Sequence, residues 1–140
     1  MSHARGWLRK MKITLDEGGC AHYGMVFKGQ DVLPMDDWIG RHIQFEFSGA
    51  IRCVACDRPT QKSFNQGYCY PCSQSLAACD LCIMKPETCH FHQDTCREPE
   101  WGKAHCMIDH FVYLANTTGI KVGLTRTGQV PTRWLDQGAI

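Results

Sequence analysis

The chain has 140 residues and a formal charge of +1, which fits one medium domain or two very small ones. Leu, Ile, Val and Phe number 28 of the 140 residues, or 20%, so apolar burial alone offers little stability. The near-neutral charge gives no global support for a polyanionic partner, and apolar runs of about five residues exclude a membrane span.

Ten cysteines allow two interpretations, an extracellular disulfide scaffold or an intracellular metal protein. Six of the ten lie in Cys-x-x-Cys pairs, a spacing that suits a metal better than bridges. The basic N-terminus is followed by no apolar stretch, as a secretory signal would require. We therefore expect a cytoplasmic zinc protein.

Residues 1–52 show the alternation of apolar and polar side chains that is typical of strands. One face carries Trp7, Ile13 and the residues between them at period two, and a second alternation runs over residues 43–48. Turn residues stand at Gly18–Gly19 and at Gly29. The pattern predicts a small antiparallel β unit.

Residues 53–109 carry nine of the ten cysteines and no sustained periodicity. Their strongest signal is two Cys-x-x-Cys pairs separated by twelve residues: Cys53, Cys56, Cys69 and Cys72. Each pair forms a tight turn that presents two sulfurs to one side of a tetrahedral ion. We predict a zinc ribbon with a structural Zn²⁺, since four protein ligands leave no open position; the alternative is four buried thiols without metal.

A second cluster follows, in which Cys79 and Cys82 form a third Cys-x-x-Cys pair. We expect a second Zn²⁺ on Cys79, Cys82, His92 and Cys96, with Cys89 the nearest substitute. The spacing leaves open a third zinc and the choice of ligands among Cys89, His90, His92, His105, Cys106 and His110. An iron–sulfur cluster is less favoured, because the tight Cys-x2-Cys-x2-Cys run is missing and histidines are interspersed.

Residues 110–140 change character again. Strands are predicted over 111–115 and 120–124, with a turn at 116–119 between them. Pro131 is predicted to be the first residue of a helix whose pattern stops at Gly138. With the preceding segments, this indicates a mixed, β-rich α+β fold of three segments, 1–52, 53–109 and 110–140.

This last segment resembles the GIY-YIG nuclease module. The resemblance rests on Val112-Tyr113 at a strand end, on Lys121-Val122-Gly123 in the next strand, and on Arg133 in the following helix. It implies a small antiparallel sheet with flanking helices and metal-assisted phosphodiester cleavage. Tyr113 would activate the nucleophile with Lys121 nearby, and Arg133 would bind phosphate.

Each of these three residues also has a plainer interpretation. Tyr113 suits a half-buried strand position, Lys121 a solvated strand position and Arg133 the surface of a helix. The loop between the two nuclease motifs is also shorter than usual. The metal-binding Glu of that family lies further downstream, and no acidic residue follows Asp136. Cleavage would therefore need an acidic residue supplied from beyond this chain.

The whole chain is also similar to an uncharacterised bacterial family, the domain of unknown function numbered twenty-seven ninety-seven. The similarity is carried by four runs, residues 6–8, 62–69, 95–102 and 133–139. Members of that family are usually longer, so we expect this chain to be the N-terminal portion of one. Membership implies no established activity.

These observations favour a zinc-stabilised protein that binds nucleic acid, with local basic patches in the first twelve and last twenty residues. The alternatives are a non-enzymatic zinc scaffold for protein contacts and a redox or metal sensor that uses the surplus thiols. The candidate partners are thus nucleic acid, another protein, or a segment C-terminal to this chain, and no membrane is expected.

Overall fold

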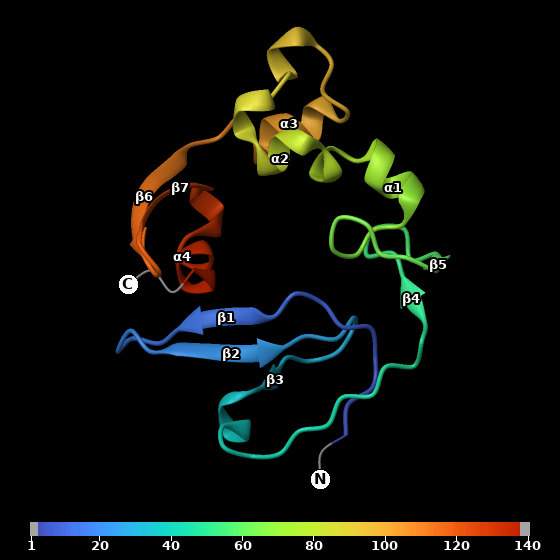
Figure 1. Cartoon of the computed structure of the whole chain (residues 1–140), viewed down its shortest axis with the longest axis vertical. Coiled ribbons are helices and arrows are strands. Elements are labelled where there is room, and N and C mark those ends of the chain that lie inside the picture. Colours follow the sequence, from blue (N-terminus) through green and yellow to red (C-terminus); the bar gives the residue numbers. More distant parts are fainter. Residues whose placement is uncertain (1–2, 138–140) are drawn as a thin grey trace. The chain divides into compact units, whose positions relative to one another are not determined.

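The computed structural model describes residues 3–137 and divides into two compact units (Figure 1). Unit 1 consists of residues 1–45 and 110–140, and unit 2 of residues 46–109. Short helices and small antiparallel sheets make up both, which confirms the predicted mixed α+β class. Residues 1–45 of the first predicted segment and the last segment, residues 110–140, thus belong to one unit, whereas residues 46–52 belong to unit 2.

The N-terminal part of unit 1 is a three-stranded antiparallel sheet of order β1-β2-β3, with strands Lys12–Leu15, Ala21–Met25 and Leu33–Pro34. The turn between β1 and β2 lies where the glycine pair predicts it. Asp16 Oδ1 accepts hydrogen bonds from the backbone N–H groups of Gly18, at 2.9 Å, and Cys20, at 2.8 Å. Gly19 adopts φ +81°, which glycine tolerates without a steric penalty.

The predicted strand over residues 43–48 is wrong. After β3 the chain makes a 3-10 helix, η1 (Asp36–Trp38), and residues 41–50 form no strand. Phe45 is 68% exposed and Phe47 is 74% exposed. Alternation alone does not make a strand, since a strand also needs a neighbour to accept its backbone hydrogen bonds, and this segment has none.

The two strands predicted near the C-terminus are confirmed as a hairpin of β6 (His110–Asn116) and β7 (Ile120–Arg126). A 3-10 helix, η5 (Thr127–Gln129), and helix α4 (Thr132–Asp136) follow. The helix begins one residue later than predicted, because Pro131 is its cap. The predicted stop at Gly138 lies outside the described residues.

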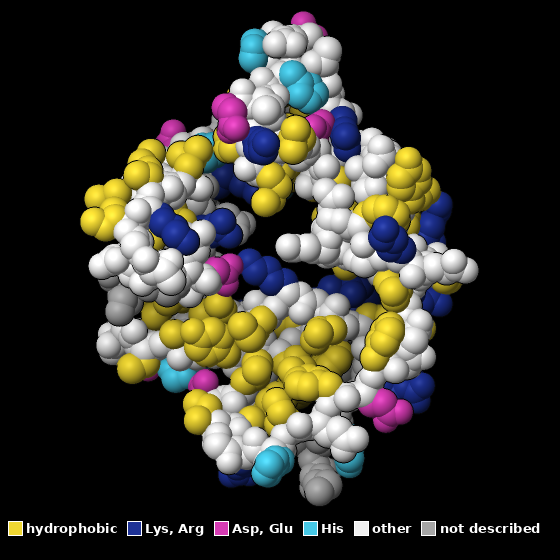
Figure 2. Space-filling view, in the orientation of Figure 1, with side chains coloured by type: hydrophobic (Ala, Val, Ile, Leu, Met, Phe, Trp, Pro, Cys, Tyr) yellow, Lys and Arg dark blue, Asp and Glu magenta, His cyan; other side chains and the backbone are white. Residues whose placement is uncertain are grey.

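The hairpin is covered on one face only. The ring of Trp134 in α4 meets the rings of Phe111 and Tyr113 edge-on, at centroid distances of 6.3 and 6.1 Å. On the opposite face Val112, Leu114 and Val122 are each 72% exposed, and hydrophobic side chains gather there in the space-filling view (Figure 2). An ion pair from Lys10 Nζ to Asp136 Oδ2, 2.9 Å long, joins α4 to the segment before β1.

Unit 2 is built from short elements in which helices replace most of the predicted loops. Three of its prolines, Pro71, Pro86 and Pro99, stand in the first turn of a helix, where the missing N–H group costs nothing. In the part of the chain that the structure describes, no helix is long and apolar enough to cross a bilayer. The elements are β4 (Ile51–Arg52), β5 (Pro59–Thr60), α1 (Tyr70–Ser75), η2 (Ala77–Cys79), α2 (Leu81–Met84), η3 (Pro86–Thr88), η4 (Phe91–Gln93) and α3 (Pro99–His105).

Candidate metal centre

The first cysteine pair lies in the loop that connects β4 to β5. This loop is closed by two backbone hydrogen bonds of 3.0 Å, from Asp57 N to Cys53 O and from Cys53 N to Arg58 O. Asp57 adopts φ 62°, the left-handed conformation that lets the chain reverse in so few residues. The Arg52 guanidinium donates to Asp57 O at 2.9 Å and holds the turn from outside.

The second pair lies at the start of α1, not in a second β turn. Cys69 is the N-cap residue of the helix and Cys72 lies in its first turn, where Ser73 N donates to Cys69 O at 2.9 Å. Gly67, with φ +134°, ends the turn that leads into this helix. The Gly67 carbonyl accepts a 2.8 Å hydrogen bond from Val54 N, which joins the two pairs.

The four sulfurs converge, as the spacing predicts. The Sγ atoms of Cys53, Cys56, Cys69 and Cys72 all lie within 4.8 Å of one another. Cys56 Sγ and Cys69 Sγ are 3.7 Å apart, and a tetrahedron with Zn–S bonds of about 2.3 Å has edges of about 3.8 Å. The donor set therefore fits a zinc ion, which would have four protein ligands and no open position.

The electrostatics of the cluster favour a bound cation. Burial raises the pKa of Cys53, but hydrogen bonds from the backbone N–H groups of Cys56, Cys69 and Ala55 outweigh it and lower the pKa to about 6. The hydrogen bond with Cys69, followed by burial, raises the pKa of Cys72 to about 12. Repulsion between neighbouring thiolates prevents all four thiols from ionising when no cation is bound. A dication would stabilise the four thiolates together.

Cys79 is not grouped with Cys82 around a common centre. Burial raises the pKa of Cys79, the charge of Arg97 opposes this, and the charges of Cys53 and Cys69 raise the pKa further. Asp80 separates η2 from α2 in an extended conformation, with φ −71° and ψ 151°. The third Cys-x-x-Cys pair is therefore split between two helices and does not form a turn around a common centre.

The predicted second ligand set, Cys79, Cys82, His92 and Cys96, is not gathered in the structure. Among residues 3–137, the other group of potential ligands within 4.8 Å of one another is Asp80, Cys82 and His90. Asp80 Oδ2 already accepts from Arg97 Nε at 3.0 Å and pairs with His90 Nε2 at 3.2 Å. Asp80 is not among the ligands predicted from the sequence, because a single carboxylate directly before a helix is typical of an N-cap residue.

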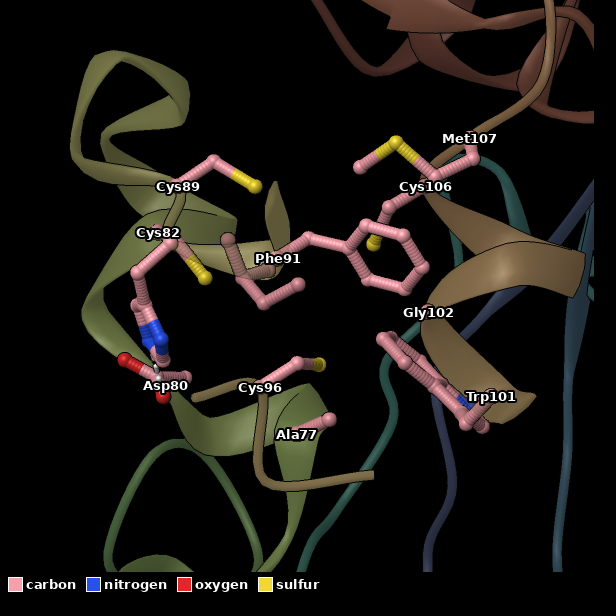
Figure 3. A pocket seen from close by; sticks show the side chains of 12 residues that line it. Ala77, Asp80, Cys82, Cys89, Phe91, Cys96, Trp101, Gly102, Cys106 and Met107 are labelled. Carbon is pink, nitrogen blue, oxygen red and sulfur yellow. Dashed lines mark hydrogen bonds and ion pairs between the residues drawn. The ribbon is translucent and has the colours of Figure 1, made fainter. Parts of the chain in front are cut away.

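Four other thiols line one pocket in unit 2. Cys82, Cys89, Cys96 and Cys106 share its wall with Phe91, Trp101 and several smaller side chains (Figure 3). Burial raises the pKa of Cys82, and the charges of Asp80, Cys89 and Cys106 raise it further. The cysteines that follow the first cluster thus meet at this pocket, apart from Cys79.

The predicted catalytic residues lie in unit 1. Tyr113 and Lys121 belong to the hairpin face that α4 covers, because Tyr113 pairs with Gly123 and Lys121 with Ala115 across the strands. The Tyr113 hydroxyl donates to Gln137 Oε1 at 2.8 Å. Arg133 is exposed on α4. The roles of these residues in phosphodiester chemistry stay predictions.

Residues 40–140 match the family described as "Protein of unknown function (DUF2797)". Neither a curated protein nor a solved structure matches the chain. The family match includes all of unit 2 and the β6–β7 hairpin with α4, and so both cysteine clusters. Since it spans well over half of the sequence, the chain belongs to the DUF2797 family.

Proposed function

We propose that this is a cytoplasmic, zinc-stabilised protein whose first Zn²⁺ is held by Cys53, Cys56, Cys69 and Cys72. The observation that carries the proposal is the convergence of the four sulfurs within 4.8 Å. With every coordination position taken by protein, this ion is structural, and its binding contributes about 10 kcal/mol or more to folding. The expected result of chelation is unfolding of unit 2.

We further propose that unit 1 binds nucleic acid. Unit 1 contains nine Lys and Arg side chains against six Asp and Glu, a formal charge of +3. Unit 2 contains six against eight, a formal charge of −2, and each zinc with four thiolates adds −2 more. Folding therefore places both basic segments of the sequence in one unit, which supports a phosphate-binding surface there.

The proposed interface is formed by the exposed side chains of Lys121 in β7 and Arg133 on α4. An Arg guanidinium presents a planar fork that suits phosphate oxygens, and a Lys ammonium adds a positive charge beside it. Phosphodiester cleavage in the manner of the GIY-YIG module would further require a metal-binding carboxylate from beyond Asp136.

Titration of labelled single- and double-stranded RNA and DNA at two salt concentrations tests the interface. Binding should weaken steeply as salt rises, because cations bound to phosphates are released on association. Lys121→Ala or Arg133→Ala should weaken binding to all sequences and reduce the salt slope by about one. Lys103→Ala in unit 2 is the matched control, and the absence of binding even at low salt would reject the interface.

The alternative is a non-enzymatic scaffold for protein contacts. It is favoured by the uncovered hairpin face, where Val112, Leu114 and Val122 are each 72% exposed and lie next to one another. A protein partner bound there would be released by Val122→Lys and would be far less sensitive to salt. The two functions therefore differ in the residue that matters and in the response to ionic strength.

A further inference from the structure

The pocket in unit 2 brings together four thiols that stand in separate turns of the chain. The sulfur atoms of Cys82, Cys89, Cys96 and Cys106 point into it from different sides (Figure 3). With the first cluster and Cys79, they account for every cysteine after Cys20. We propose that these four cysteines are the ligands of a second structural Zn²⁺.

Each of the four sulfurs is supplied by a different element. Cys82 lies in α2, Cys89 directly follows η3, Cys96 lies beyond η4, and Cys106 ends α3. An ion bound by all four would therefore join α2, η3, η4 and α3 at one point. Structural zinc sites of four thiolates serve this purpose in small domains that have little apolar material to bury.

The packing of this region calls for such a centre. Among residues 80–109, all of which the structure describes, only Gly102 is buried. The helical segments are three to seven residues long, too short to be stable by themselves. Ordering their backbone costs conformational entropy, and four zinc–thiolate bonds are a source of stabilisation that apolar burial does not provide here.

The neighbouring polar groups position the site and do not compete for the ion. His90 Nδ1 pairs with Thr95 Oγ1 at 2.7 Å, and its Nε2 pairs with Asp80 Oδ2. Both ring nitrogens are thus engaged, and Asp80 is also paired with Arg97. Cys82, in contrast, faces the pocket that holds the other three thiols.

The sulfur atoms around the pocket lie farther apart than those of the first cluster. No three of the four pocket sulfurs lie within the 4.8 Å that encloses the first cluster. Binding of an ion would draw the turns around the pocket inward, to sulfur–sulfur separations of about 3.8 Å. The second zinc is therefore expected to order residues 80–109 more strongly than the first orders its own turns.

The wild-type full chain, purified under reducing conditions, provides the first test. Elemental analysis should give two zinc ions per chain, and X-ray absorption at the zinc edge should show sulfur alone at about 2.3 Å. Nitrogen scattering at about 2.0–2.1 Å, equivalent to one imidazole per two zincs, would overturn this ligand set in favour of one with histidine. One zinc per chain, with Cys82, Cys89, Cys96 and Cys106 joined as disulfides, would overturn the second site itself.

Single substitutions identify the ligands. Cys89→Ser and Cys106→Ser should each lower the zinc content from two ions to one. Cys79→Ser, His92→Asn and the control Cys20→Ser should each keep two ions. If instead Cys79→Ser and His92→Asn lose an ion while Cys89→Ser and Cys106→Ser retain both, the proposed ligand set is wrong.

The same measurements separate failure of this inference from failure of the first site. A single ion that is lost in Cys53→Ser but kept in Cys89→Ser would leave the first site intact and reject the second. A single ion with the opposite pattern would reject the first site and retain the second. Both patterns are read from zinc content in the soluble protein, and the wild-type absorption spectrum decides the ligand type even where a variant does not fold.

Discussion

The ring of Tyr113 lies directly over Gly123, its partner across the β6–β7 hairpin. A Cβ atom on Gly123 would come within 2.5 Å of the Tyr113 hydroxyl oxygen and 2.6 Å of Cε1, and closer still to Cζ. Glycine is therefore the residue that lets the tyrosine ring lie flat against the strand. The hydroxyl is held at the other end by Gln137, so the ring is fixed between hairpin and helix.

Gly123→Ala should accordingly destabilise unit 1 by about 1–3 kcal/mol, the usual cost of forcing an extra carbon into a packed site. The ring cannot move aside without losing its hydrogen bond to Gln137. Urea unfolding of the zinc-loaded protein measures the change. Val122→Ala is the matched control, since Val122 is 72% exposed on the other face and should change the stability by less than about 0.5 kcal/mol. Equal stabilities of the two variants would contradict the contact.

Arg97 connects the end of α1 to Asp80, which directly precedes α2. Its Nη1 donates to the carbonyls of Ser73, at 3.1 Å, and Leu76, at 3.2 Å, where α1 ends, and its Nε pairs with Asp80. Arg97→Ala leaves these carbonyls and the carboxylate without their donor, at a cost of about 2 kcal/mol. Arg97→Lys should recover only part of this, because an ammonium group cannot form the fork.

Thermal unfolding of the zinc-loaded protein measures the effect of Arg97. The control is Lys103→Ala, which removes an exposed ion pair with Glu100 and should cost less than about 1 kcal/mol. A midpoint for Arg97→Ala that matches this control would show that the guanidinium does not hold α1 to the segment after it.

The first cysteine cluster was predictable from sequence because its geometry is local. Two residues between the cysteines of a pair place both sulfurs on one side of the local backbone, in the β4–β5 loop and in the first turn of α1, and a twelve-residue gap is long enough for the two pairs to meet. The β6–β7 hairpin was predictable for the same reason, since a short turn and two alternating strands determine the pairing. Both features depend on residues that are close in the sequence.

The second cluster could not be placed from spacing. The pair Cys79 and Cys82 resembles the first two pairs, but the extended backbone at Asp80 sends the two side chains to different places. The thiols that share the pocket are separated by six, six and nine residues, which is no recognised spacing. Their proximity results from the way short helices pack, and the strand predicted at residues 43–48 failed because pairing likewise depends on distant partners.

A histidine in unit 1 makes stability depend on pH. His22 Nε2 pairs with Asp16 Oδ2 at 3.0 Å, and its Nδ1 pairs with Asp36 Oδ2 at 2.5 Å. The hydrogen bonds to Asp16 and then Asp36 raise the pKa of His22 above its usual 6.5. The stabilisation is complete below pH 6.5 and is lost as the pH rises through the higher pKa of the folded state.

The Asp16 carboxylate sets the lowest pH at which the contact with His22 still stabilises the fold. The hydrogen bond from His22, followed by the Cys20 backbone N–H, lowers the pKa of Asp16 below 3.8, so its contribution is lost only as the pH falls through that lower value. The melting temperature of His22→Gln should therefore differ from wild type in weakly acidic buffer and converge with it in alkaline buffer. His42→Gln is the control, and a difference that is independent of pH would contradict the charged contact.

The central claim is that Cys53, Cys56, Cys69 and Cys72 hold a zinc ion that stabilises unit 2. Its most direct test is the zinc content and melting temperature of Cys69→Ser beside wild type. Cys69 is 1% exposed and its sulfur lies 3.7 Å from that of Cys56, so serine at this position removes a buried ligand. We predict that the first zinc ion is lost and that the melting temperature falls. Unchanged zinc content with an unchanged melting temperature would contradict the claim.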